Sequence, residues 1–430
     1  MPIDDTFARI GRAVRTVFQG WIGLVRKPGG AVKKLIMAII LTSFICLFPA
    51  VAPSAPSAAD GVSVLTYRLN SDITGTDRQF SFVHITDLHL GEGFDDYGTS
   101  GYDDSPPAGD VGAPAVALRN SVNWINANCQ KSKIKFVIIT GDITDSAEKS
   151  EFLKAKEILD SLSVPYVPML GNHDVWPYTA SAGTQFPVGD RYFSEVFGSQ
   201  FDKLKDLLPG WDDGTRSTPI WNGEADSASS ADAGCVSYFQ NFAFDYAGYH
   251  FICSDFTTRN FAINGKGSMP EGDLFDSSKC QGTWPWFKRH FNAYPHKASK
   301  NMLMFSHQPF FPFPLVNFDS IEYGTITGFL GFGDNGDFSG VCVGGHIHLD
   351  REYYILDSST EVCPAVWTGA NKDGTGHLRV VEVWGKTANN YSWLVIVLGV
   401  SLFALLTVLF IERRRRRRIT TYCRETSEVE

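Results

Sequence analysis

The sequence has little charge overall, and its central part has little positive charge. Only 20% of its 430 residues are charged while 43% are hydrophobic, a composition that argues against a disordered chain. Residues 60–411 hold 24 Lys and Arg against 41 Asp and Glu, so this region is acidic. Such a charge repels polyanions, and we expect no nucleic acid partner for the folded part. No internal repeat or coiled-coil pattern is present, and we expect one large globular domain.

Cysteine is scarce as well, with eight residues in the chain. Six of them fall in the central region, namely Cys129, Cys235, Cys253, Cys280, Cys342 and Cys363. An even number there is compatible with disulfide bonds in an oxidising compartment, but the sequence does not say which cysteines would pair. The alternative is that these cysteines are reduced and buried as small apolar side chains.

Two long hydrophobic runs lie near the ends of the chain. Residues 393–411 contain no charged residue and would form a helix of about 28 Å, enough to span the hydrocarbon core of a bilayer. An arginine run at residues 413–418 follows, and the positive-inside rule places it in the cytosol. We therefore expect a transmembrane helix at residues 391–411 and a cytosolic Arg-rich tail at residues 412–430. The alternatives for the arginines are nucleic-acid binding and a retention signal.

The second run, residues 35–48, follows Lys33 and Lys34 and precedes a stretch of small residues that reaches Ala59. This is the layout of a secretory signal, so residues 1–59 are expected to be a basic leader with a signal peptide or, if uncleaved, a signal anchor. Both outcomes place residues 60–390 on the non-cytosolic side. We expect a membrane protein with a lumenal or extracellular domain, single-pass after cleavage and two-pass without it.

The central region alternates short apolar runs with helical patterns. The runs are residues 80–86, 135–140, 166–170, 301–306 and 340–344. Nearly continuous apolar strands of this kind are typical of sheets covered on both faces. Helical patterns at residues 113–128 and 147–162 separate the first three runs, which predicts a β-α-β-α-β unit with a partly parallel sheet. Because ligands of open α/β sheets bind beyond the carboxyl ends of the strands, we expect the residues after the runs to meet at one edge.

Each run ends in residues that bind metals. The motifs, in chain order, are Asp87-Leu88-His89, Gly141-Asp142, Gly171-Asn172-His173-Asp174, His307 and Gly345-His346-Ile347-His348. Each motif alone is common, but the ordered set at five strand ends is a specific signal. Its oxygen and imidazole ligands, without a thiolate, suit Fe, Zn and Mn about equally.

The chemistry of phosphoryl transfer explains these residue types. Two cations about 3.5–4 Å apart can clamp the attacking and leaving oxygens, and a carboxylate between them offsets their repulsion. The predicted ligands are Asp87, His89, Asp142 and His348 for one metal, and Asp142, Asn172, His307 and His346 for the other. Asp142 is thus the predicted bridge. A water held between the metals would have its pKa lowered towards neutrality and would supply a hydroxide as the nucleophile.

His173 is the one histidine of the set that is not needed as a ligand. We expect it to donate a hydrogen bond to a phosphoryl oxygen or to protonate the leaving alkoxide, and we expect Asp174 to hold its tautomer. The alternatives are a structural role for His173 and a turn or cap role for Asp174. Asp145 and Asp350 are either partners of the ligands or solvated acids, and His84 is expected to be a satisfied core histidine.

The ordered motifs resemble those of the calcineurin-like metallophosphoesterase family over residues 78–384. The resemblance implies an α/β fold of four layers (α/β/β/α) with two mixed sheets, and a dinuclear site of Fe, Zn or Mn held by the ligands assigned above. It also implies that the chain hydrolyses phosphomonoesters or phosphodiesters, with His173 as the catalytic histidine.

Differences from the motifs of particular subfamilies argue against two of these subfamilies. Protein phosphatases of the family have an arginine where Ser146 stands, so a phosphoprotein substrate is disfavoured. Purple acid phosphatases have Gly in place of His89 and Tyr in place of Asp145, so a tyrosinate-iron site is not expected. The general pattern is most similar to cyclic-nucleotide-phosphodiesterase-like members.

The hypothesis that results is a metal-dependent hydrolase of small phosphoesters, anchored in a lipid bilayer and more phosphodiesterase-like than protein-phosphatase-like. The sequence does not distinguish a preference for monoesters from one for diesters. The alternative is a membrane receptor or scaffold that keeps the metals for structure alone. A missing ligand or a missing His173 would favour that alternative, and neither is missing.

Overall fold

The structure is a computed structural model of the chain, in which two compact units are distinguished. It describes residues 61–70, 76–99, 105–176, 189–213, 219–221, 237–258, 272, 274, 282–294, 301–309, 318, 320–330, 340–357 and 360–386. The first unit comprises Met1–Arg68 and Phe80–Glu382, and the second comprises Leu69–Gln79 and Val383–Glu430. All predicted site residues belong to the first unit. Of the second unit, the described residues are ends of the strands β1, β2 and β13 and Asn70.

The first sheet has five strands in the order β1-β13-β2-β3-β4. Their bounds are Val62–Leu69 for β1, Gly376–Lys386 for β13, Thr76–Ile85 for β2, Ile134–Ile139 for β3 and Tyr166–Pro168 for β4. β2 is parallel to β3, and β3 is parallel to β4. The connections between them contain α3 (Ala113–Asn128) and α4 (Lys149–Leu159), so the predicted β-α-β-α-β unit is present.

Helix α4 begins two residues later than the apolar pattern predicts, at Lys149. Glu148 is its N-cap residue, and a capping box joins Glu148 to Glu151. The Glu151 carboxylate accepts hydrogen bonds from the backbone N–H groups of Glu148 (3.1 Å) and Ser146 (3.0 Å). These N–H groups would otherwise be buried without acceptors, so the cap fixes where the helix starts.

The second sheet has six strands in the order β11-β12-β10-β9-β8-β7. Their bounds are Arg351–Asp357, Thr360–Trp367, Val341–Gly344, Met302–Phe305, Tyr249–Cys253 and Phe242–Tyr246. The four central strands β12, β10, β9 and β8 run parallel to one another. The outer strand β11 is antiparallel to β12, and the outer strand β7 is antiparallel to β8. The short strands β5 (Pro219–Trp221) and β6 (Ser237–Tyr238) pair separately. β5 lies within residues 209–234, a stretch whose Gly, Ser and Asp content is typical of a loop.

Aromatic side chains fill the space between the two sheets. Phe82 on β2 stacks on Phe136 on β3, with ring centroids 5.6 Å apart. Across the interface, Phe82 meets Phe251 on β8 (5.6 Å) and Phe305 on β9 (5.9 Å) edge to face. All four rings are buried. Such edge-to-face pairs are favourable, and they hold β2 and β3 against the strands that carry the other half of the site.

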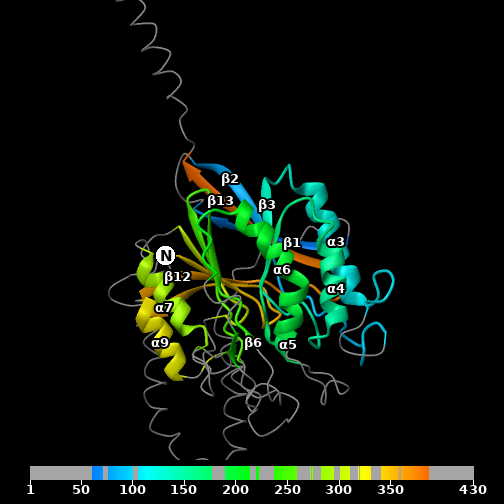
Figure 1. Ribbon diagram of the computed structural model, residues 1–430. Coiled ribbons are helices and arrows are strands. Elements are labelled where there is room, and N and C mark those ends of the chain that lie inside the picture. The colour runs from blue at the N-terminus through cyan, green and yellow to red at the C-terminus, as the bar shows by residue number, and fades with distance from the viewer. Residues whose placement is uncertain are drawn as a thin grey trace, which may run out of the picture. The chain divides into compact units, whose positions relative to one another are not determined.

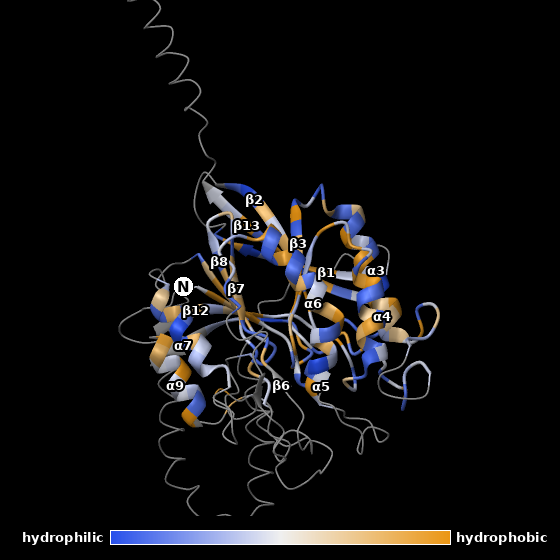
Figure 2. Ribbon diagram, viewed as in Figure 1, coloured by the Kyte–Doolittle hydropathy of each residue, from blue (hydrophilic) through white to orange (hydrophobic). Residues whose placement is uncertain are grey.

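Helices cover the outer sides of both sheets (Figure 1). α3, α4 and α6 (Gly189–Leu207) lie on one side, where α6 buries Phe193, Phe197 and Phe201 at helical spacing. α7 (Trp284–Ala293) and α9 (Ser320–Leu330) lie on the other, in a cluster that joins Phe287 and Ile326 to the second sheet. Hydrophobic residues accordingly alternate with hydrophilic ones along these helices (Figure 2). The expected two mixed sheets with flanking helices are therefore present.

The predicted membrane segments, residues 35–48 and 391–411, lie outside the described residues. In the part of the chain that the structure describes, no helix has both the length and the apolar character needed to cross a bilayer. Cys129, Cys253, Cys342 and Cys363 are buried free thiols, as the alternative to disulfide pairing expects. Cys235 and Cys280 lie outside the described residues.

Candidate metal centre

The structure brings together all the residues predicted to bind metals. They follow the ends of β2 (Asp87 and His89), β3 (Asp142), β4 (Asn172), β9 (His307) and β10 (His346 and His348). Three of these strands belong to the first sheet and two to the second. The ligand set therefore forms where the carboxyl ends of both sheets meet.

The first group of possible ligands consists of Asp87, His89, Asp142 and His348, whose donor atoms all lie within 4.8 Å of one another. His348 Nε2 is 3.3 Å from Asp87 Oδ1 and 3.1 Å from His89 Nε2. His89 Nε2 is also 3.7 Å from Asp142 Oδ2. Two carboxylates and two imidazole nitrogens that face one centre are a suitable donor set for Zn, Mn or Fe.

The second group consists of Asp142, His307 and His346, again with donor atoms within 4.8 Å of one another. His307 Nε2 is 3.1 Å from Asp142 Oδ2 and 3.0 Å from Asn172 Oδ1, so the Asn172 amide oxygen faces the same centre. Asp142 is the member that both groups share. This is the position that a bridging carboxylate must occupy.

The backbone at these residues is strained. Five of the predicted ligands have positive φ angles, with 54° at Asp87, 47° at His89, 47° at Asp142, 69° at His346 and 55° at His348. Residues with a Cβ atom rarely adopt this left-handed conformation, and it costs on the order of 1–3 kcal/mol each. The strain turns successive side chains of one short segment towards a single point, which an extended strand with alternating side chains cannot do.

Two glycines allow the strand ends to approach one another. A Cβ atom on Gly345 would lie 2.0 Å from Thr86 Oγ1 and 2.5 Å from Asp87 Oδ2. A Cβ atom on Gly171 would lie 2.2 Å from Asp142 Oδ1. Any other residue at these two positions would push a predicted ligand carboxylate away.

Hydrogen bonds fix the orientation of two ligand imidazoles. His307 Nδ1 donates to the Thr140 carbonyl oxygen at 2.8 Å, which leaves Nε2 as the ring nitrogen directed at Asp142. His89 Nδ1 lies 3.1 Å from Asp145 Oδ1, which in the same way leaves Nε2 as the ring nitrogen that faces the other ligands. Histidines that bind metals commonly donate their second ring N–H in this manner. The donor set therefore fits metal ions.

The site carries ionised carboxylates in a buried setting. Burial opposes the ionisation of Asp87, but the hydrogen bond to His348 and the charge of His307 outweigh it and lower the pKa of Asp87 to about 2. The pKa of Asp142 is also lowered, because the histidines around it outweigh its burial. Burial disfavours the charged form of His307, yet Asp142 raises the pKa of His307 to about 9. Two buried carboxylates that attract protons onto nearby imidazoles would attract a metal cation in the same way.

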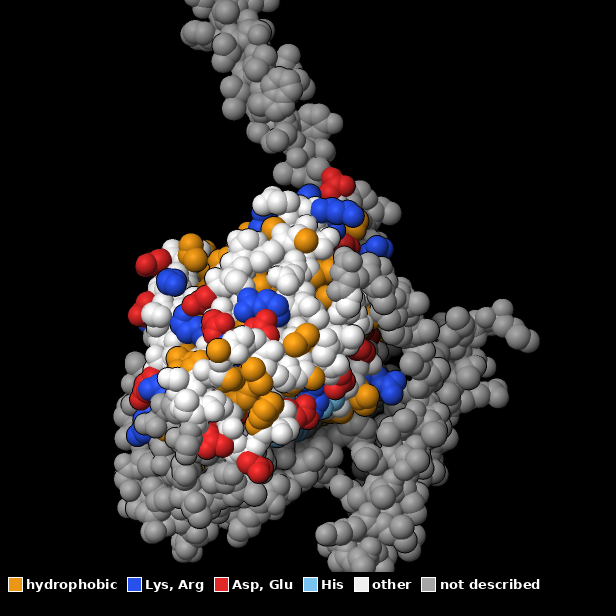
Figure 3. Space-filling view, turned by 90° about the vertical axis from the view of Figure 1, so that its right-hand side faces the viewer, with side chains coloured by type: hydrophobic (Ala, Val, Ile, Leu, Met, Phe, Trp, Pro, Cys, Tyr) orange, Lys and Arg blue, Asp and Glu red, His pale blue; other side chains and the backbone are white. Residues whose placement is uncertain are grey.

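His173 lies at the rim of the ligand set. Its ring meets that of His89 edge to face at 4.5 Å, and its side chain is 25% exposed. Figure 3 shows a small area of histidine side chains at the surface, beside hydrophobic and acidic groups. His173 Nδ1 donates to the backbone carbonyl of Asp145 at 2.7 Å, so Nε2 is the ring atom left to meet a substrate.

The expected contact between Asp174 and His173 is not what the structure shows, because Asp145 is the partner of the His173 ring. The Asp174 carboxylate is buried and accepts hydrogen bonds from Thr144 N (2.8 Å), Thr144 Oγ1 (2.9 Å) and Gly171 N (2.8 Å). Burial and the charge of Asp142 raise the pKa of Asp174 to about 7. Asp174 thus joins the segments after β3 and β4, a turn role that the sequence had left open.

Asp145 is the residue whose importance the sequence left undecided. Its carboxylate contacts His89, and its carbonyl accepts from His173, so one residue positions a predicted ligand and the predicted catalytic group. Asn371 was not predicted at all. Its backbone N–H lies 3.1 Å from the carbonyl oxygens of both Thr86 and Asp87. Asn371 follows the end of β12, at the same edge of the sheet as His346. This position is the sequence signal that could have indicated Asn371.

The structure also gives the contacts of His84 and Asp350, two residues that the sequence singled out beside the ligands. His84 is fully buried between the hydroxyls of Thr368 and Thr140, each 2.7 Å from a ring nitrogen, and burial lowers its pKa to about 3. It is therefore the satisfied core histidine that was predicted. Asp350 accepts hydrogen bonds from Gly369 N and Arg379 and pairs with His377, so it is not a solvated acid.

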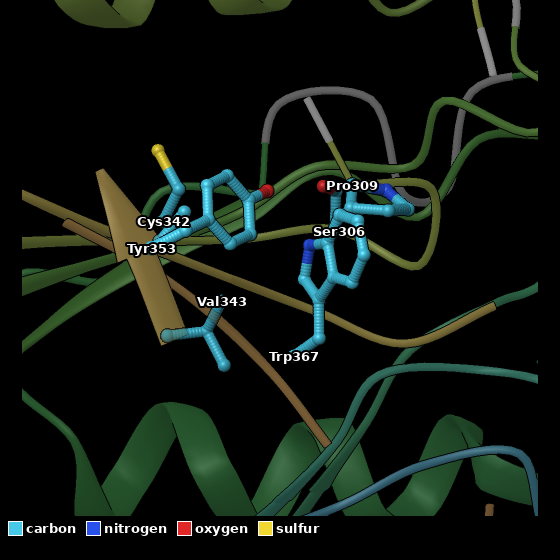
Figure 4. Close-up of a pocket in the computed structure, with 8 residues that line it drawn as sticks. Ser306, Pro309, Cys342, Val343, Tyr353 and Trp367 are labelled. Carbon is cyan, nitrogen blue, oxygen red and sulfur yellow. The ribbon is translucent and has the colours of Figure 1, made fainter. Parts of the chain in front are cut away.

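A small pocket lies close to the site but does not include the predicted ligands (Figure 4). It is bordered by Ser306 and Pro309 on either side of His307, and by Tyr353 and Trp367, whose rings meet edge to face at 4.9 Å. None of its lining residues is a predicted ligand or His173.

Comparison with known proteins gives a family match. A family model described as calcineurin-like phosphoesterase matches residues 80–350. No curated protein matches the chain. The motifs that this region contains are those described above, from Asp87 to His348.

The chain is also similar in structure to several solved proteins. A 5'-nucleotidase from Candida albicans has 15% identity and a TM-score of 0.35, with 68% of this chain and 46% of that chain covered. The inner membrane complex anchor GAP50 of Plasmodium has 11% identity and a TM-score of 0.33, with 69% and 73% covered. Purple acid phosphatase PPD1 from yellow lupin (Lupinus luteus) seeds has 13% identity and a TM-score of 0.33, with 70% and 43% covered. This chain thus spans less than half the length of the nucleotidase and of the phosphatase.

Proposed function

The chain belongs to the calcineurin-like phosphoesterase family, and from this premise we propose that it is a phosphoester hydrolase whose seven predicted ligands and His173 form a dinuclear hydrolytic site. The substrate is a small phosphoester, and a phosphodiester is preferred. The observation that carries the proposal is the position of Asp142, whose carboxylate belongs to both groups of possible ligands.

The proposed ligands are those assigned from the sequence. Asp87, His89, Asp142 and His348 would hold one ion, and Asp142, Asn172, His307 and His346 would hold the other. When bound, two such ions neutralise the charge of the phosphoryl group and lower the pKa of water, which makes a nucleophile available near pH 7. The contacts of His89 with Asp145 and of His307 with Thr140 would hold the Nε2 atoms of both rings in the direction of the ions.

His173 is the proposed catalytic group. Because Nδ1 donates to the Asp145 carbonyl, a neutral ring would have no proton on Nε2, and the protonated ring would have one to give. Protonated His173 would hydrogen-bond a phosphoryl oxygen and transfer its Nε2 proton to the leaving alkoxide. Asp145 would hold the ring in the orientation that this transfer needs.

The test of the site uses the full-length chain with Asp142→Asn and His307→Ala. Each change removes one proposed ligand, and each is expected to lower kcat/KM by at least about 10³-fold, which corresponds to about 4 kcal/mol of transition-state stabilisation. Asp202→Asn on α6, an exposed residue outside the site, is the control. Full activity in both ligand variants would exclude the proposed site.

The preference for a phosphodiester rests on the segment after Asp142. In this segment Ser146 stands where the protein phosphatases of the family have an arginine, and Ser146 is fully buried. A buried serine cannot contact the substrate as that arginine would, so a phosphodiester is favoured over a phosphoprotein. The test compares kcat/KM for an aryl phosphate with that for a bis-aryl phosphodiester, in parallel with cyclic nucleotides, nucleotides and phospholipid headgroups. A higher value for the monoester would refute the preference.

The proposed location is a membrane, with residues 60–390 on the lumenal or extracellular side and residues 412–430 in the cytosol. It rests on the uncharged run at residues 393–411 and on the arginines at 413–418. The acidic central region is consistent with a domain that does not bind nucleic acid.

A further inference from the structure

A second histidine cluster lies apart from the metal centre. His250 is on β8, opposite Met302 at the start of β9, whereas the proposed ligand His307 follows the end of that strand. His290 is on α7, which covers the outer side of the same sheet. The two imidazoles are buried: the exposed fraction of the surface is 3% for His250 and 6% for His290. The cluster is therefore at the amino end of the parallel strands, opposite the edge that holds the metal ligands.

The two imidazoles belong to a row of four hydrogen-bonded groups. His250 Nδ1 is 2.7 Å from Asp245 Oδ1, and His290 Nδ1 is 2.8 Å from Asp212 Oδ2. Between them, His250 Nε2 is 2.8 Å from His290 Nε2, and the rings are within 7° of parallel. All three distances are those of hydrogen bonds. The row from Asp245 to Asp212 thus contains three hydrogen bonds in series.

Three hydrogen bonds in series need three protons. A neutral imidazole carries one N–H, and an ionised carboxylate carries none, so the four groups in their ordinary states supply only two. If each Nδ1–H were donated to its carboxylate, the two Nε2 lone pairs would face each other at 2.8 Å in a buried place. Unpaired acceptors so placed cost free energy, and one additional proton between the nitrogens removes this cost.

The charges around the row balance one additional proton. The titratable or charged groups that face the imidazoles are Asp245 from β7, Asp212 from the segment before β7, Arg289 from α7 and Tyr294 after α7. Arg289 donates to Asp212 at 3.0 Å. The two carboxylates carry two negative charges, and Arg289 with one additional proton offsets both.

A second additional proton is disfavoured. Burial lowers the pKa of His250, and the charge of His290 lowers it further. Burial likewise lowers the pKa of His290. Burial opposes the first additional proton as well, but the hydrogen bonds to Asp245 and Asp212 favour it, and the 2.8 Å contact between the two Nε2 atoms needs it.

We propose that the row Asp245-His250-His290-Asp212 is a buried proton-binding device that ties α7 to β7 and β8 and makes the stability of the fold depend on pH. In the unfolded chain, each imidazole titrates near pH 6.5. Above about pH 6.5, the folded row holds one proton and the unfolded pair holds fewer, so stability falls as pH rises. Below about pH 6.5, the unfolded pair binds more protons than the folded row, so stability falls as pH falls. The contribution of the row is therefore greatest near pH 6.5.

The experiment measures urea unfolding of the full-length chain in detergent between pH 5 and pH 9, for the native sequence and for His290→Gln. The glutamine amide can donate to His250 Nε2 without an additional proton. We compare the unfolding equilibrium constant of the native chain with that of the variant. Above pH 7.5, the ratio of the native constant to the variant constant should rise by up to about tenfold per pH unit, because unfolding of the native chain releases one proton. Parallel pH profiles for the two proteins would overturn the proposal.

Two further variants form a matched pair. Asp212→Asn removes the negative charge of a carboxylate that belongs to the row. Asp213→Asn removes an equal charge from the neighbouring residue, whose carboxylate pairs with Lys205 at 2.8 Å and lies outside the row. The loss of stability at alkaline pH should move to lower pH in Asp212→Asn alone. An equal shift in both variants would mean that general charge, and not the row, is responsible.

A direct measurement on the native chain keeps the proposal testable if a variant does not fold. With histidines labelled at Cε1, the signals of His250 and His290 should lie between the neutral and charged positions and stay constant from pH 6 to pH 8. Titration of both near pH 6.5, or two neutral imidazoles throughout, would overturn the proposal. A signal change on chelation, reversed by Zn²⁺, would show that a metal and not a proton joins the nitrogens.

Discussion

At the scale of single residues, the metal centre depends on conformations that most residues avoid. Asp87, His89, Asp142, His346 and His348 all have left-handed backbone angles directly after strands. Such strain persists only where surrounding contacts fix it. The backbone N–H of His346 lies 3.0 Å from both carboxylate oxygens of Asp87, which ties two of the strained segments together. Small changes beside these residues should therefore have large effects on metal binding.

The close packing of Gly345 leads to a first prediction. Gly345→Ala would place a Cβ atom 2.5 Å from Asp87 Oδ2, so we expect loss of bound metal and of most activity. Gly324→Ala in α9 is the matched control, because nothing lies within 4 Å of its Cβ position. That variant should keep full activity and gain roughly 0.5–1 kcal/mol of stability, as expected for alanine in a helix. Metal content, activity and urea unfolding are measured for both; normal metal content in Gly345→Ala would contradict the prediction.

The contact of Asp145 with His89 leads to a second prediction. Asp145→Ala removes the acceptor of the His89 Nδ1–H, so the ring loses its fixed orientation. Loss of such a partner typically lowers metal affinity about 10–100-fold. Competition with a chelator measures the affinity, and Asp110→Asn, whose carboxylate pairs with Arg119, serves as the control. Unchanged affinity in Asp145→Ala would show that Asp145 does not position His89.

At the scale of helices and strands, the sequence predicted the elements better than their ends. The strands that carry the ligands and helix α3 were all recognisable, because buried strands and amphipathic helices have apolar patterns of fixed period. The start of α4 was not, since it depends on the Glu148 and Glu151 cap and not on periodicity. The role of Asp174 was misassigned because its neighbour in sequence, His173, turns towards Asp145 instead.

The aromatic contacts between the sheets lead to a third prediction. Phe82 is fully buried and meets Phe251 and Phe305 of the other sheet. Phe82→Ala should therefore lower the free energy of unfolding by roughly 3–5 kcal/mol. The same change at Phe94, which is 38% exposed, should cost far less. Urea unfolding of the two variants measures the difference, and equal losses would argue against Phe82 as a principal contact between the sheets.

At the scale of the whole molecule, the proposed anchors would determine the side of the membrane on which the catalytic domain lies. The run at residues 393–411 and the arginines after it predict one membrane crossing near the C-terminus.

Deletion of residues 391–430 tests this topology. If the leader is cleaved, the shortened protein should leave the membrane fraction on carbonate extraction with kcat unchanged, because the deletion removes only the anchor and tail. Retention in the membrane would mean that residues 35–48 also anchor the chain. In sealed microsomes, a tag after Glu430 should be digested by protease while residues 60–390 stay protected. Protection of the tag would contradict the proposed orientation.

The sequence by itself determined the chemistry of the site, because metal ligands must be particular residue types and these follow apolar strands in a recognisable order. Only the tertiary structure decided which groups act together. The sharing of Asp142 between two ligand groups, the double contact of Asp145 and the row from Asp245 to Asp212 all join segments distant in the chain. Such contacts depend on how two sheets and a helix pack, and side-chain periodicity within one element carries no information about them.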